Sequence, residues 1–151
     1  MRALGIDLGS RRIGVALCDS AGTLATPYET VERSGDVALD HRRLLALAEE
    51  AEVECLVVGL PLSLDGTVGP AAQGVLDEID RLRSTTPLPV ETYDERLTTV
   101  TADHLLRQGG RGGRARRKVV DQTAAAVLLQ GWLDARAARR HRLDPPPSSD
   151  A

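Results

Sequence analysis

The spacing of apolar residues along the chain follows two periods and predicts an α/β domain. Three short apolar runs at Ala3–Asp7, Ile13–Asp19 and Thr23–Val31 are separated by glycine-containing turns, which is typical of strands joined by tight antiparallel connections. Proline at position 27 favours an edge position for the third strand, because proline cannot donate a ladder hydrogen bond. The chain therefore opens with a three-stranded meander.

Helical and strand-like patterns alternate after the meander. We expect helix 36–52, strand 55–59, helix 70–84, strand 90–93, a helix from Thr98 or Thr99 to about residue 108, and a helix from about Val119 to Arg140. Strands joined by a helix run parallel, because the crossover returns the chain in the same direction. The resulting order, βββαβαβαα with a mixed five-stranded sheet, is that of the ribonuclease-H-like fold.

Length and composition narrow the class of protein. A chain of 151 residues predicts one domain, residues 1–142, and a disordered tail, residues 143–151, that holds three consecutive prolines. With no Phe, one Trp and two Tyr, the chain lacks the aromatic platforms of base-stacking modules. No apolar run approaches the ~20 residues of a membrane span, and Asp7 stands where a signal peptide would be apolar. We therefore expect a cytoplasmic protein, with Cys18 and Cys55 as buried free thiols.

Acidic residues lie where the predicted parallel strands end. Asp7 ends the first strand, Asp94 and Glu95 follow the fifth, and Asp121 opens the last predicted helix. In open α/β sheets, functional groups gather at the carboxyl ends of the strands. Three carboxylates brought together repel one another unless a divalent cation lies among them. The pattern indicates Mg²⁺, and two such ions about 3.5–4 Å apart suit in-line displacement at phosphorus.

Each acid also has a structural interpretation. Asp7 could bond the turn that follows it, Asp94 could cap or turn the chain, and Glu95 could pair with Arg96 or with the arginines of segment 107–118. Asp121 could complement the dipole of the last helix. The convergence of the acids on one edge of the sheet, more than any one of them, favours the catalytic interpretation.

Positive charge gathers in one segment of an otherwise acidic chain. The net charge is −3, but residues 1–106 hold 9 basic and 18 acidic residues, whereas residues 107–151 hold 10 basic and 4 acidic ones. Segment 107–118 is rich in Arg and Gly, and it adjoins Asp121. Such a segment either balances the acidic body or binds nucleic-acid phosphates with release of counterions. The predicted phosphate contacts are Arg111, Arg114, Arg116, Arg117 and Lys118, with Arg11, Arg12 and Arg96 as further ones.

Two other functions fit parts of this pattern. Gly5–Gly9 is also similar to the phosphate loop of actin-like sugar kinases, but those proteins need two such domains around a nucleotide. No Walker A pattern precedes Lys118, the sole lysine. A non-catalytic nucleic-acid-binding module would need the basic segment but not the convergent acids, so the acids favour an enzyme.

Four segments in order, Gly5–Ala16, Val57–Pro61 with Asp65–Thr67, Asp94–Thr99 and Val120–Ala125, together resemble the YqgF/RuvX family of small bacterial ribonuclease-H-like proteins. The resemblance runs from Gly5 to about Leu133. It implies a metal-dependent endonuclease that uses Mg²⁺ or Mn²⁺. The family's acidic positions match Asp7, Glu95 and Asp121. Related resolvases carry an acid on the fourth strand, where this chain has Gly59-Leu60-Pro61, so the choice between Asp94 and Glu95 stays open.

The resemblance implies two substrates. The first is the 5′ end of precursor 16S ribosomal RNA, and the alternative is a four-way DNA junction, which makes the protein a Holliday junction resolvase. Symmetric cutting of a junction favours a two-fold homodimer. An apolar group on the last helix is a candidate dimer contact, although the core is the stronger interpretation; it comprises Leu128, Leu129, Trp132 and Leu133.

Overall fold

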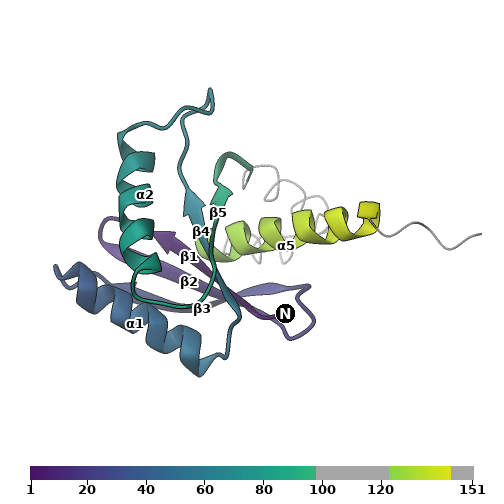
Figure 1. Ribbon diagram of the computed structural model, residues 1–151, viewed down its shortest axis with the longest axis horizontal. Coiled ribbons are helices and arrows are strands. Elements are labelled where there is room, and N and C mark those ends of the chain that lie inside the picture. The colour runs from purple at the N-terminus through teal and green to yellow at the C-terminus, as the bar shows by residue number, and fades with distance from the viewer. Residues whose placement is uncertain (98–122, 144–151) are drawn as a thin grey trace, which may run out of the picture.

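A mixed β-sheet with helices on both faces forms the body of the protein (Figure 1). The computed structural model describes residues 1–97 and 123–143. The elements are β1 Ala3–Leu8, β2 Arg12–Cys18, β3 Ala25–Glu32, α1 Val37–Glu50, β4 Cys55–Leu60, α2 Pro70–Arg83, β5 Val90–Asp94 and α5 Ala124–Leu143. This order confirms the predicted α/β architecture. The predicted helix at 98–108 and residues 144–151 of the predicted tail lie outside the described residues.

The strands lie in the order β3-β2-β1-β4-β5, so β1 is central. β1 pairs antiparallel with β2, where Asp7 lies opposite Gly14, and parallel with β4, where Ile6 lies opposite Val58. β4 pairs parallel with β5. β3 is an edge strand, as Pro27 predicts. The carboxyl ends of β1, β4 and β5 therefore meet at one edge of the sheet.

Alternating side chains divide the core into two layers. Leu4 and Ile6 of β1 pack with α1 and α2 on one face, whereas Ala3 lies with α5 on the other (Figure 1). Gly5 also faces α5 and lets the helix approach closely, because a Cβ there would lie 2.8 Å from the Leu129 Cβ. Asp7 has the same phase along β1 as Ala3 and Gly5, so it lies on the α5 face.

Local capping determines where the helices begin. The Asp36 carboxylate accepts hydrogen bonds from two backbone N–H groups and starts α1, and Pro70 lies in the first turn of α2. α5 begins at Ala124, because the Thr123 hydroxyl accepts a hydrogen bond from the Ala126 N–H at 3.2 Å. The predicted start at Val119, and Asp121 with it, lie outside the described residues.

The burial of individual side chains tests the predictions for the apolar group of α5 and for the two cysteines. Leu128, Leu129, Trp132 and Leu133 are at most 4% exposed and pack against the sheet, so this group is core and the candidate dimer contact is wrong. Both cysteines are buried free thiols, as predicted. Within the part of the chain that the structure describes, no helix has the length and apolar character needed to cross a membrane.

Candidate active site

Two acidic side chains meet at the edge where the parallel strands end. Asp7 is the penultimate residue of β1, and Glu95 directly follows β5. A hydrogen bond joins their carboxyl groups, and both residues are half-buried. The Glu95 N–H donates to the Leu60 carbonyl at 3.0 Å, which holds the start of the connection after β5 against the end of β4.

A glycine on β4 leaves the space that Glu95 occupies. A Cβ at Gly59 would lie 2.6 Å from Glu95 Oε1 and 3.0 Å from Leu128 Cδ2, closer than ordinary contacts allow. On the other side of β1, a Cβ at Gly14 would lie 3.7 Å from the Asp7 Cβ. The glycine at position 59 therefore lets the Glu95 side chain extend across the end of β4 toward Asp7.

The pair is electrostatically unfavourable when both groups are ionised. Burial raises the pKa of Asp7, and the hydrogen bond with Glu95 offsets only part of this rise. Burial also raises the pKa of Glu95, and the negative charge of Asp7 raises it further. Two adjacent carboxyl groups then titrate as one unit, and a cation between them would favour the doubly ionised form. Two desolvated carboxylates are also the oxygen donors that Mg²⁺ prefers, so the residues present fit a divalent metal.

Asp94, the neighbour of Glu95, is engaged elsewhere. Arg96 donates from Nε and Nη2 to Asp94 Oδ2 at 2.9 and 2.6 Å, and its backbone N–H donates to Oδ1 at 2.9 Å. These hydrogen bonds lower the pKa of Asp94. Arg96 also donates to the Leu64 carbonyl at 3.3 Å. The Arg96 guanidinium therefore pairs with Asp94. The alternative partners predicted for Glu95, the arginines of segment 107–118, lie outside the described residues.

A half-buried ion network fixes the turn that follows Asp7. Arg33 Nε donates to the Gly9 carbonyl at 2.9 Å, while its Nη1 and Nη2 donate to the Glu78 carboxylate at 2.8 and 3.0 Å. His41 Nε2 lies 2.8 Å from the same carboxylate. Gly9 itself has no room for a side chain, because a Cβ would collide with the Arg12 carbonyl. The network thereby connects α1, α2 and the β1–β2 turn.

No sequence pattern indicates the ion pair that supports the turn next to Asp7. Arg33 and Glu78 are 45 positions apart and carry no motif, so the chain alone gives no signal for their contact. Gly59 was detectable, since a glycine inside an apolar strand often marks a close approach.

The remaining predicted site residues differ in how much the structure describes. Arg11 and Arg12 are exposed in and next to the β1–β2 turn, at the same edge as Asp7. Asp121 and the basic positions 111–118 lie outside the described residues. Within residues 1–97 and 123–143, no group of three or more His, Cys, Asp or Glu side chains could hold a metal ion. The described chain contributes two adjacent acids to this edge.

The strand order and the helices on both faces define the class of protein, a ribonuclease-H-like fold. Two structures of Thermus thermophilus RuvC are similar to this chain, one of them in complex with a Holliday junction substrate. Their TM-scores are 0.55 and 0.57, each at 17% identity over 91% of this chain and 96 and 97% of the RuvC chains. This similarity shows the fold.

The chain belongs to the RuvX family. The family model, described as "RuvX: Holliday junction resolvase", matches residues 1–135. A Rhodococcus opacus relative named "Putative pre-16S rRNA nuclease" is 51% identical over 140 residues, covering 90% of this chain and 79% of the relative. A relative of the same name from Desulforudis audaxviator is 44% identical over 141 residues, covering 93% and 99%. Membership places the chain in a family of nucleases.

Proposed function

We propose that this protein is a metal-dependent endonuclease that hydrolyses phosphodiester bonds and trims the 5′ end of precursor 16S ribosomal RNA in the cytoplasm. The observation that carries the proposal is the contact between Asp7 and Glu95. Burial and mutual repulsion oppose the ionisation of both carboxyl groups, and a bound cation would stabilise their doubly ionised form.

Asp7 and Glu95 would hold Mg²⁺ or Mn²⁺ together with Asp121. Two such ions, when bound, supply activation of a water and stabilisation of the leaving oxygen at phosphorus. The chain's own residues supply the positioning. Gly59 leaves room for Glu95, and the Arg33–Glu78 pair holds the turn next to Asp7. Asp94 is paired with Arg96. Of the two adjacent acids Asp94 and Glu95, the geometry therefore supports Glu95 as the metal ligand.

Basic residues would hold the substrate backbone against this edge. Arg11 and Arg12 are exposed at the same end of the sheet as Asp7. The basic positions 111–118 adjoin Asp121 in sequence and supply five further charges. Guanidinium groups match phosphate oxygens and release counterions on binding, which gives affinity without sequence preference. Arg96 remains a weaker prediction as a phosphate contact, because Asp94 neutralises much of its charge.

The relatives' shared name supports precursor ribosomal RNA as the substrate. The description of the matching family model supports a second candidate, the four-way DNA junction. A junction substrate would require a homodimer, so that two active sites meet two strands. A non-catalytic binding module would leave the adjacent, desolvated acids without a role.

Three single substitutions in β5 and at the residue that follows it test the proposal. Glu95→Gln should reduce metal-dependent cleavage of a precursor 16S RNA at least ~10²-fold, because it removes a ligand. Asp94→Asn and Glu91→Gln make the same type of change nearby and should stay within a few-fold of wild type. Glu91 is an exposed residue of β5, the strand that Glu95 follows. Cleavage by Glu95→Gln at the rate of Glu91→Gln would remove Glu95 from the site.

A further inference from the structure

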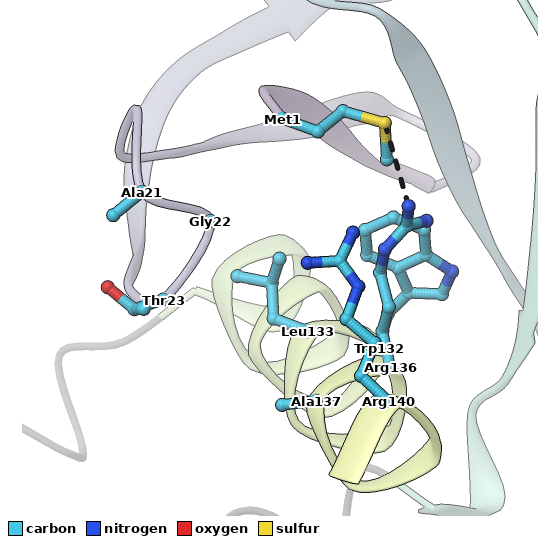
Figure 2. A pocket seen from close by; sticks show the side chains of 9 residues that line it. All are labelled: Met1, Ala21, Gly22, Thr23, Trp132, Leu133, Arg136, Ala137 and Arg140. Carbon is cyan, nitrogen blue, oxygen red and sulfur yellow. Dashed lines mark hydrogen bonds between the residues drawn. The ribbon is translucent and has the colours of Figure 1, made fainter. Parts of the chain in front are cut away.

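The C-terminal half of α5 and the β2–β3 turn enclose a second site, far from the acid pair. A cavity of about 230 Å³ lies between them (Figure 2). Trp132, Leu133, Arg136 and Arg140 line it from α5, while Gly22 and Met1 line the opposite side. Met1 lies two residues before the start of β1, whereas Asp7 lies near the other end of that strand, so the cavity and the acids occupy opposite ends of the sheet.

Two guanidinium groups enter this cavity side by side (Figure 2). Arg136 lies over the Trp132 ring with its guanidinium carbon 5.2 Å from the ring centroid, and it donates to Met1 Sδ at 3.8 Å. These contacts hold Arg136 in place before any ligand binds. Among residues 1–97 and 123–143, neither Arg136 nor Arg140 forms an ion pair with a carboxylate.

Within the described residues, no carboxylate forms an ion pair with the two guanidinium groups of the cavity. Arg136 and Arg140 are four residues apart on one helix face, an arrangement in which like charges destabilise a helix. An anion between them would remove the repulsion. The cavity is smaller than the ~300 Å³ at which small-molecule sites begin, so it suits a phosphate group and not a whole nucleotide. The arginine side chain is also the one whose planar fork matches phosphate oxygens.

We infer that this cavity, the α5 phosphate pocket, holds a backbone phosphate of the nucleic-acid substrate at a distance from the bond that is cut. The inference rests on the proposed nuclease function. Ala125 lies beside Asp7, since both contact the position of a Cβ on Gly14. From Ala125 to Arg140 the helix rises about 23 Å at 1.5 Å per residue. A duplex of about one helical turn is long enough to span this distance.

A matched pair of charge variants tests this pocket. Arg140→Gln removes a guanidinium that lines the cavity, whereas Arg139→Gln removes an exposed neighbour that does not. Binding of duplex RNA is measured without divalent metal over a range of salt concentrations. Arg140→Gln should reduce the slope of log K against log salt by about 0.7–0.9, the value of one phosphate contact. Arg139→Gln should leave the slope unchanged.

Trp132 reports on the pocket directly, because it is the only tryptophan in the chain. Titration with inorganic pyrophosphate should change its fluorescence in wild type and in Arg139→Gln, and the change should be lost in Arg140→Gln. Equal salt slopes for Arg140→Gln and wild type would overturn the inference. Equal slopes would overturn it even if pyrophosphate binds, because the pocket would then bind a free anion and not a phosphate of the nucleic acid. Neither readout uses cleavage, so a wild-type protein that cuts no substrate would count against the proposed function alone.

Discussion

Gly59→Ala adds a single methyl group and should disturb the position of Glu95 much more than the stability of the fold. The added Cβ would lie 2.6 Å from Glu95 Oε1. Restoring an ordinary contact of at least 3.4 Å requires a displacement of roughly 0.8 Å, and Glu95 is the flexible partner. A catalytic group misplaced by about 1 Å can cost ~10²-fold in rate. We therefore expect metal-dependent cleavage to fall about 100-fold.

The same change should affect stability much less. Because the Glu95 carboxylate and the Leu128 methyl group are ends of flexible side chains, the overpacking should cost about 1 kcal/mol, the low end of the usual range. The assay pairs the cleavage rate with the free energy of unfolding in urea. Gly74→Ala is the control, because a Cβ there meets nothing within 4 Å and the position lies on helix α2. That variant should gain about 0.5–1 kcal/mol and keep full activity.

The loss of cleavage rate, compared with the loss of stability, shows whether Gly59 positions Glu95 or only supports packing. If Gly59→Ala unfolds readily and loses activity in proportion, Gly59 supports packing of α5 and does not specifically position Glu95. If it cleaves at the wild-type rate with unchanged metal dependence, Glu95 does not act from the position it occupies across the end of β4.

Three other predictions concern electrostatics. Asp7→Asn should make the metal-free protein more stable at pH 7. The raised pKa values of Asp7 and Glu95 mean that wild-type stability falls as pH rises above their ordinary values of 3.8 and 4.5, so thermal melts of the two proteins should diverge with increasing pH. Glu78→Gln leaves the Arg33 charge half-buried without its partner and should cost about 3 kcal/mol in urea unfolding. Neutralising the five basic residues at 111–118 should weaken RNA binding and flatten its salt dependence, measured by fluorescence anisotropy. An unchanged salt slope would remove that segment from the interface.

The pattern of the chain determined the sheet because each strand carries its own signal. The short apolar runs of β1 and β4 specify a buried central pair, and Pro27 marks the edge. Local chemistry was harder to predict at element ends. Thr123 and Asp121 both precede an apolar run, and only the hydrogen bond from the Ala126 N–H shows that α5 starts at Ala124.

The acid site was predictable in position and not in detail. Strand ends placed Asp7 and Asp94–Glu95 at one edge, but the spacing could not show which of the neighbours meets Asp7. Glu95 meets Asp7 because adjacent side chains near the end of β5 point to opposite faces of the sheet and because Gly59 leaves space for the Glu95 side chain. Asp94 instead accepts a hydrogen bond from the Arg96 guanidinium. The Arg33–Glu78 pair depends on contacts between distant elements, which no local pattern encodes.

Cleavage by wild type and Asp7→Asn on two substrates with and without Mg²⁺ or Mn²⁺ tests the account most directly. One substrate is an RNA with the 5′ end of precursor 16S ribosomal RNA, and the other is a synthetic four-way DNA junction. We expect wild type to cut the RNA only with metal, and Asp7→Asn to retain its fold and binding while cleavage is abolished. Cutting of the junction instead would select the resolvase alternative. Metal-independent cutting, or equal cutting by Asp7→Asn, would contradict the assignment of the acid pair as the metal site of a nuclease.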